Sequence, residues 1–134
     1  MATYNWGVDK SFIAGEDMSA SQYYFVIPVA SAAGYVEIAG TAAASVLGVL
    51  QNDPVAGEEA QVRMMGFTKV RCNAESAASP LVFGGLVKSA SDGMATGALN
   101  PAASSITAGV SMEAVATGSG QYIEIFLIPT GIRG

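Results

Sequence analysis

Residues 44–50 read ASVLGVL and residues 61–65 read QVRMM, with a loop between them that contains Pro54 and Gly57. Short apolar or alternating segments are typical of strands, and Pro and Gly are typical of turns. The pattern therefore predicts strand, loop, strand. The same arrangement returns 61 residues later, as SITAGVS at residues 105–111 and YIEIF at residues 122–126.

The two copies align without a gap, and they share their glycines and their alternating apolar residues. Residues 29–34 (VASAAG) also resemble residues 87–93 (VKSASDG), with one extra residue in the second copy. A self-similar unit at a fixed spacing indicates a fold built from repeated parts, so we predict an internal duplication of a strand-loop-strand unit. The aligned pairs are Gly48 with Gly109, Gly57 with Gly118, Val62 with Ile123, and Met64 with Ile125.

The whole chain reads as short strands separated by turns, which predicts a mainly β fold: one compact, barrel-like or sandwich-like domain. Gly66 predicts a bulge or kink between two strands, and Asp92-Gly93 predicts a hairpin turn. Three Ala-rich segments, at residues 41–45, 73–79 and 100–104, are expected to form short helical turns or loops. Strands are predicted at residues 23–29, 35–38 (a hairpin with the first), 45–51, 60–65, 67–72, 80–88, 106–114 and 121–128.

A chain of 134 residues has the length of one domain. Residues 1–16 show no clear period and are predicted to form an N-terminal arm, with residues 17–134 as a single β-rich domain. Trp6 is the only tryptophan, and a buried indole contributes several large contacts, so the arm is expected to dock on this subunit or on a neighbour. The N-terminus does not resemble a signal peptide, and no apolar run is long enough to predict a membrane span.

Charged residues make up only 13% of the chain, about half the usual share, and the net charge is −5. A surface with so few charges favours an oligomer, in which part of that surface lies against other chains. Nucleic-acid binding requires clustered Lys and Arg, whereas the six basic residues of this chain are scattered along the sequence. We therefore predict neither a nucleic-acid nor a membrane partner. Arg63, Lys69 and Arg71 come nearest to a cluster and are interpreted as charges on a solvated sheet face.

The chain has no histidine, which removes the commonest general base and the commonest zinc ligand. Cys72 is the only cysteine, so no disulfide within the chain can form, and assembly in a reducing compartment is expected. Arg71 beside it could activate the thiol, but a small buried strand residue is the preferred interpretation. Met64, Met65 and Met112 are likewise interpreted as core residues.

The remaining polar motifs predict no catalytic or metal site. Asp53, Glu58 and Glu59 surround the first loop, but their spacing matches no calcium loop, and a solvated acidic turn is preferred. Glu16-Asp17 forms no identifiable catalytic pair. Gly118-Ser119-Gly120 lacks the third glycine of a dinucleotide fingerprint, and Gly84-Gly85 lacks the Lys-Ser/Thr of a phosphate loop, so both are interpreted as turns. We therefore predict no metal, no cofactor and no enzymatic activity.

Taken in order, these segments resemble the small capsid decoration, or cement, proteins of tailed bacteriophages. The resemblance covers about residues 14–129, and its specificity lies in the order of the motifs, since each motif alone is a β-turn pattern. They are AGEDMS at 14–19 before the strand at 23–29, GYV at 34–36, VLGVLQNDP at 46–54 with AGE at 56–58, QVRMMGFTK at 61–69, and GVSMEA at 109–114 followed by the strand at 122–129.

The resemblance implies a β-rich subunit, usually a trimer, that binds the major capsid protein on the outer surface of the virion and stabilises the capsid. The protein would assemble in the host cytoplasm. Such proteins carry no catalytic residues. In several of them an N-terminal arm adds to the capsid contact, and here Tyr4, Trp6 and Phe12 are the candidate partner-binding residues.

Two other functions fit the same sequence. One is another structural part of the phage particle, such as a head fibre base or a tail component. The other is a carbohydrate-binding β module, in which exposed Tyr23, Tyr35 or Tyr122 would stack on sugar rings. This last function has less support, because alternating strands bury about half of such residues in any β protein.

Overall fold

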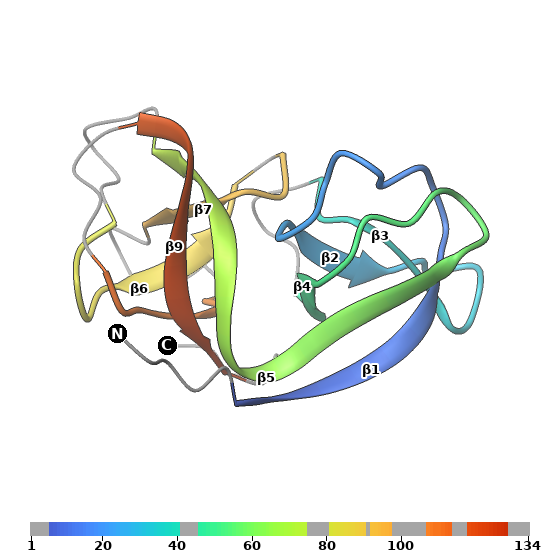
Figure 1. Ribbon diagram of the computed structural model, residues 1–134, viewed down its shortest axis with the longest axis horizontal. Coiled ribbons are helices and arrows are strands. Elements are labelled where there is room, and N and C mark those ends of the chain that lie inside the picture. The colour runs from blue at the N-terminus through green and yellow to red at the C-terminus, as the bar shows by residue number, and fades with distance from the viewer. Residues whose placement is uncertain are drawn as a thin grey trace.

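Two small closed sheets share one long strand in this protein (Figure 1). The computed structural model describes residues 6–40, 46–74, 81–90, 92–97, 107–113 and 118–128. These residues contain nine strands and no helix. The strands are β1 (Gly7–Ala14), β2 (Phe25–Pro28), β3 (Tyr35–Ile38), β4 (Gly48–Leu50), β5 (Glu59–Ala74), β6 (Leu86–Ser89), β7 (Ala95–Gly97), β8 (Gly109–Ser111) and β9 (Gly118–Leu127).

The first closed sheet, here called the N-terminal barrel, consists of β1 to β4 and residues 59–66 of β5. Strand β1 pairs in parallel with β3, and β3 pairs antiparallel with β2. Strand β2 continues to β4, and β4 to β5, both antiparallel. The antiparallel pairing of β5 with β1 then closes the ring.

The second closed sheet, the C-terminal barrel, consists of residues 66–74 of β5 together with β6 to β9. Strand β5 pairs in parallel with β7, and β7 pairs antiparallel with β6. Antiparallel pairs then join β6 to β8 and β8 to β9. The antiparallel pair of β9 with β5 closes this ring. The five pairings and their directions repeat those of the N-terminal barrel, which confirms the predicted duplication.

The duplication extends to individual backbone hydrogen bonds at the predicted spacing of 61. Tyr23 N–H donates to Leu50 O at 2.8 Å, and Gly84 N–H donates to Ser111 O at 2.8 Å. The return bonds, Leu50 N–H to Tyr24 O and Ser111 N–H to Gly85 O, both measure 2.9 Å. The turn that precedes β2 and the turn that precedes β6 are therefore the same structure.

Gly48 and Gly109 are shared because the fourth strand of each barrel crosses close to the backbone of the fifth. A Cβ atom at Gly48 would lie 3.0 Å from the Arg63 carbonyl carbon, and one at Gly109 would lie 3.0 Å from the Phe126 carbonyl carbon. The carbonyl oxygens would be closer still. Only glycine allows this approach, which explains why the most regular part of the repeat is glycine-marked.

Strand β5 changes barrels at Gly66, where the strand turns sharply (Figure 1). Gly66 pairs with Gly7 of β1 on the N-terminal side and with Leu127 of β9 on the C-terminal side. Its φ of 111° is a conformation that residues with a Cβ rarely adopt. The predicted kink is thus present, but within one continuous strand and not between two.

The hydrophobic core has two clusters, and one of them crosses between the barrels. The first lies in the N-terminal barrel around Met18, Val36 and Val62. The second combines Phe25 and Val49 of the N-terminal barrel with the inner residues of the C-terminal barrel. Because this cluster joins both halves, the protein packs as one β domain, as predicted.

Some sequence-based expectations are wrong in detail. Residues 7–14, expected to lie in an irregular arm, form β1. Its residues 8–11 are all exposed, so the strand shows no apolar alternation. Residues 118–120 are not a turn but the start of β9, where tertiary pairing with Asn73 and Ala74 overrides the turn preference of glycine.

The hairpin part of the repeat was also misaligned. Val87 corresponds in register to Val26, not to Val29, since both face the glycine of their fourth strand. The second hairpin is shorter: Pro28 pairs with Val36, whereas Ser89 pairs with Ala95. The segments expected to form helical turns, at 41–45, 75–79 and 100–104, lie outside the described residues, while Asn73 and Ala74 belong to β5.

Candidate partner-binding surfaces

Trp6 precedes β1 at the junction of the two barrels. Its carbonyl oxygen accepts a hydrogen bond from Phe67 N–H at 2.8 Å, so its backbone is held against β5. Its side chain is 55% exposed, so of the two expected docking positions, on this subunit or on a neighbour, it does not take the first within the described residues. An indole on a fixed backbone and open to solvent is a residue that binding interfaces favour.

Phe12, another predicted contact residue, does not lie beside Trp6. Phe12 lies on β1 and packs half-buried against the core of the N-terminal barrel, with the Lys10 ammonium 5.9 Å from its ring centroid. Phe12 follows Trp6 by six residue steps of extended chain, which corresponds to roughly 20 Å. Tyr4 lies outside the described residues.

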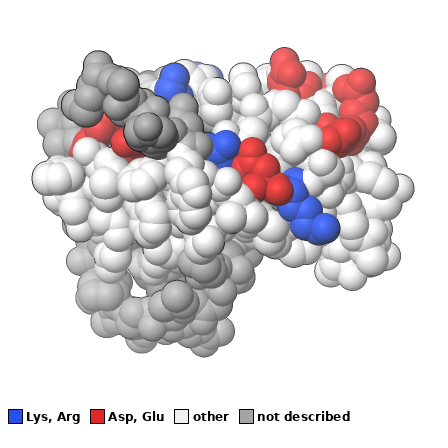
Figure 2. Space-filling model, turned by 60° about the horizontal axis from the view of Figure 1, so that its bottom comes forward, with Lys and Arg blue, Asp and Glu red and all other residues white. Residues whose placement is uncertain are grey.

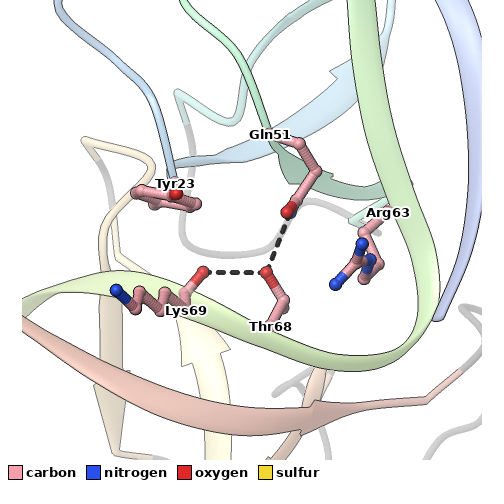
Figure 3. Close-up of a pocket in the computed structure, with 5 residues that line it drawn as sticks. All are labelled: Tyr23, Gln51, Arg63, Thr68 and Lys69. Atoms are coloured by element: carbon pink, nitrogen blue, oxygen red, sulfur yellow. Dashed lines mark hydrogen bonds between the residues drawn. The ribbon is translucent and has the colours of Figure 1, made fainter. Parts of the chain in front are cut away.

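A cleft of about 110 Å³ lies in the bend of β5, between the barrels (Figure 3). Pockets that bind small molecules usually measure roughly 300–1,000 Å³, so this cleft is small. Gln51 Nε2 donates to Thr68 Oγ1 at 2.8 Å, and Thr68 Oγ1 donates to Lys69 O at 3.0 Å. The cleft is lined by Tyr23, Gln51, Arg63, Thr68 and Lys69.

Arg63 spans the bend and holds both sides of it. Its Nε donates to Asp9 Oδ1 at 2.7 Å and its Nη2 to Asp9 Oδ2 at 3.1 Å, a bidentate pair with β1. Its Nη1 donates to Phe67 O at 2.8 Å, beyond Gly66. These hydrogen bonds hold the guanidinium within the fold, so it is not free to bind a ligand.

Of the three basic residues that the sequence grouped, Arg63 and Lys69 line the same cleft and Arg71 does not. Arg63 pairs with Asp9, while Lys69 lies opposite Glu124 in the register of β5 and β9. The Arg71 guanidinium lies 5.8 Å from the Tyr122 ring centroid. On the face shown in Figure 2, uncharged residues cover most of the described surface.

Two of the three tyrosines proposed for sugar stacking meet at the junction. Tyr23 and Tyr122 contact edge to face, with ring centroids 5.7 Å apart. Tyr35 belongs to β3 of the N-terminal barrel and pairs in register with Ile13, away from this contact. The structure therefore does not place the three rings on one platform.

Cys72 is fully buried in β5. Burial and, to a smaller extent, the nearby Glu113 carboxylate together raise the pKa of its thiol to about 11. The nucleophilic form of cysteine is the thiolate, so this thiol is unreactive at neutral pH.

The acidic residues near the first loop accept hydrogen bonds from within the fold. Glu58 Oε1 accepts from Val55 N–H at 2.9 Å, and Glu59 Oε1 accepts from Ser11 Oγ at 2.7 Å. Asp17 accepts hydrogen bonds from the Ser19 side chain and backbone, which lower its pKa. Within the described ranges, no group of three or more His, Cys, Asp or Glu residues is placed to hold a metal ion.

Among the residues that the structure describes, the most exposed large apolar side chain is that of Phe83, which was not singled out from the sequence. Val82 and Phe83 lie in the turn before β6 and are 52% and 72% exposed. The backbone beneath them is fixed by the Gly84–Ser111 bond and by Gly85 N–H donating to Val82 O at 2.9 Å. Two apolar residues followed by two glycines are the sequence signal that could have identified it.

The fold, though not the sequence, has a known counterpart. It is similar to the head fiber gp8.5 N base in bacteriophage phi29, with a TM-score of 0.62 and 16% sequence identity. The similarity covers 96% of this chain and 100% of that chain. The chain matches no protein-family model and no curated protein sequence. Within the described part of the chain, no helical segment has the length and hydropathy needed to span a bilayer.

Proposed function

We propose that this protein is a structural component of a bacteriophage head, located on the outer surface of the virion and bound to the major capsid protein. The observation that carries the proposal is the shared two-barrel fold, which covers the whole of a phage head-fibre base and nearly all of this chain. The order of sequence motifs that resembles capsid decoration proteins points in the same direction.

The physical character of the chain fits such a role. Several of its described polar groups serve the fold: Arg63 holds the bend, Glu58 holds a turn, and Glu59 joins β5 to β1. The sparse charge and the exposed Trp6 suit contacts with other proteins. Binding as an oligomer, a trimer by the family resemblance, would let several weak capsid contacts act together and give avidity.

Co-sedimentation with capsids that lack this protein tests the proposal. The protein should pellet with intact capsids, and Trp6→Ser should weaken that binding. Val55→Ser is the matched control, since Val55 is also an exposed apolar residue, at 45%, on a different turn. Failure of the unmodified protein to pellet with intact capsids of its own phage would refute capsid binding.

A head-fibre base is the second candidate, and the fold similarity favours it specifically. A base would support a projecting fibre, whereas a decoration protein would cover the lattice without one. Cryo-electron microscopy of the virion distinguishes the two by whether density projects outward from the bound protein.

A further inference from the structure

The two barrels contact each other through different surfaces. The N-terminal barrel contributes the turn before β2: Tyr23 O accepts from Arg71 N–H at 3.0 Å, and Phe25 N–H donates to Gly93 O at 2.8 Å. The C-terminal barrel contributes β5 and the tip of its β6–β7 hairpin. We call the first surface the turn face (residues 21–25) and the second the hairpin face (Arg71 and residues 92–94).

Each barrel carries both faces because the barrels are duplicates. In the C-terminal barrel the turn face corresponds to residues 82–86: Gly84 has a φ of 79° and Tyr23 a φ of 69°, with matching hydrogen bonds. In the N-terminal barrel the hairpin face corresponds to β1 and the turn around Gly34. Gly34 and Gly93 both have a φ of 83°.

The two faces that are unused within the chain carry exposed apolar side chains. A Cβ at Gly93 would lie 2.6 Å from Ile38 Cγ2, whereas one at Gly34 or Gly84 would meet no described atom within 4 Å. Phe83 and Val82 are exposed at the free turn face, and Tyr35 and Ile13, at 38% and 39%, are exposed at the free hairpin face. In Figure 1 these faces lie at opposite ends of the long axis: the yellow segment before β6 at one end, the β2–β3 turn at the other.

A contact between unlike faces leaves one free face at each end, and copies joined through such a contact form closed rings or filaments. We propose that the free turn face of one chain, residues 82–86, docks on the free hairpin face of a second copy, formed by β1 and the Gly34–Tyr35 turn. The contact between chains uses the exposed apolar side chains of the two faces, because Gly34 O, the counterpart of Gly93 O, already accepts a hydrogen bond from Ile13 N–H at 2.9 Å. This inference rests on the proposed function and specifies how copies of the chain associate. It can be tested without capsids.

The test is the native mass of the purified protein, measured by light scattering over a concentration series. The unmodified protein should form assemblies larger than one chain. Phe83→Asp and Tyr35→Asp should each reduce the mass to that of a single chain, because each places a charge in an apolar contact. Val55→Asp, at an exposed apolar site outside both faces, should leave the mass unchanged.

Mixing the two variants provides the sharper measurement. Phe83→Asp keeps an intact hairpin face and Tyr35→Asp keeps an intact turn face, so an equimolar mixture should form dimers and nothing larger. A mixture that remains monomeric would overturn the proposal, as would an unmodified protein that stays a single chain. If Phe83→Asp left the mass unchanged but abolished capsid binding, the turn would serve the capsid instead, and the proposal would be wrong. Loss of capsid binding alone, with the assembly intact, would refute only the proposed function.

Discussion

Tyr23 occupies the position in the first barrel that Gly84 occupies in the second, with φ values of 69° and 79°. A tyrosine in this conformation costs roughly 1–2 kcal/mol that glycine avoids. The N-terminal barrel tolerates this backbone strain because the Tyr23 ring packs against Tyr122 and the Tyr23 carbonyl oxygen accepts a hydrogen bond from Arg71 N–H. The second barrel has glycine there and presents Phe83 to solvent instead.

Substitutions at Tyr23 should separate the backbone cost from the side-chain gain. Tyr23→Ala and Tyr23→Gly both lose the ring contacts and should be less stable than the unmodified protein by about 1–3 kcal/mol. Tyr23→Gly should nevertheless be more stable than Tyr23→Ala by about 1 kcal/mol, since it also relieves the backbone. Urea denaturation measures this order. The reverse order would show that no strain exists at Tyr23.

Gly66→Ala should be among the most destabilising single changes in the chain. The added Cβ would lie 2.5 Å from Gly7 Cα and closer still to the Trp6 carbonyl oxygen, at a φ of 111°. We expect a loss of about 3 kcal/mol or more in the free energy of unfolding. Gly57→Ala is the control: its φ is 88° but no described atom lies within 4 Å, so only the backbone cost of about 1–2 kcal/mol should appear. Equal losses in the two variants would contradict the close approach of β1 to β5.

Gly48 and Gly109, compared with strand β1, show what the sequence can and cannot predict. The spacing of 61 and the alternation in β5 and β9 predicted the duplication, because close backbone contacts require glycine at Gly48 and Gly109 whatever surrounds them. Strand β1 was missed for the opposite reason. Residues 8–11 face solvent and carry no pattern, and only their register with β5 makes them a strand. Closure of a sheet depends on distant partners, and local sequence carries no signal for it.

The candidate site was predicted less well than the fold. Trp6 was identified, but its role as an exposed side chain on a fixed backbone depends on the bond from Phe67, which no local pattern reveals. Phe83 was passed over because its neighbours Gly84 and Gly85 were interpreted only as a turn. Exposure on a turn is decided by what packs beside it, which only the assembled barrels show.

Because Cys72 is buried, the stability of the protein should fall as the pH rises through the alkaline range. The unfolded thiol ionises above its ordinary pKa of 9.0, whereas the folded thiol stays protonated up to about 11. The unfolded state therefore binds fewer protons in this range, and the stability contributed by the buried thiol falls by about 1.4 kcal/mol per pH unit. The difference in stability between the unmodified protein and Cys72→Ala should narrow from pH 9 to pH 11 and be constant below pH 8. A constant difference throughout would mean that the thiol is not buried as described.

The fluorescence of Trp6 should report partner binding directly, since it is the only tryptophan. With its side chain 55% exposed, the free protein should show the emission of a hydrated indole and be readily quenched by acrylamide. Addition of undecorated capsids should shift the emission to shorter wavelengths and protect it from quenching. Co-sedimentation without any spectral change would remove Trp6 from the contact surface.

Strand β5 divides the chain in an order that suits synthesis on a ribosome. Every strand of the first barrel lies before residue 67, and every strand of the second begins at or after residue 66. The first barrel can thus close once β5 has reached Gly66 outside the exit tunnel, before the later strands are translated, as N-terminal units generally fold first. The rest of β5 then extends from the folded N-terminal barrel, and the strands of the C-terminal barrel pair with it as they are translated.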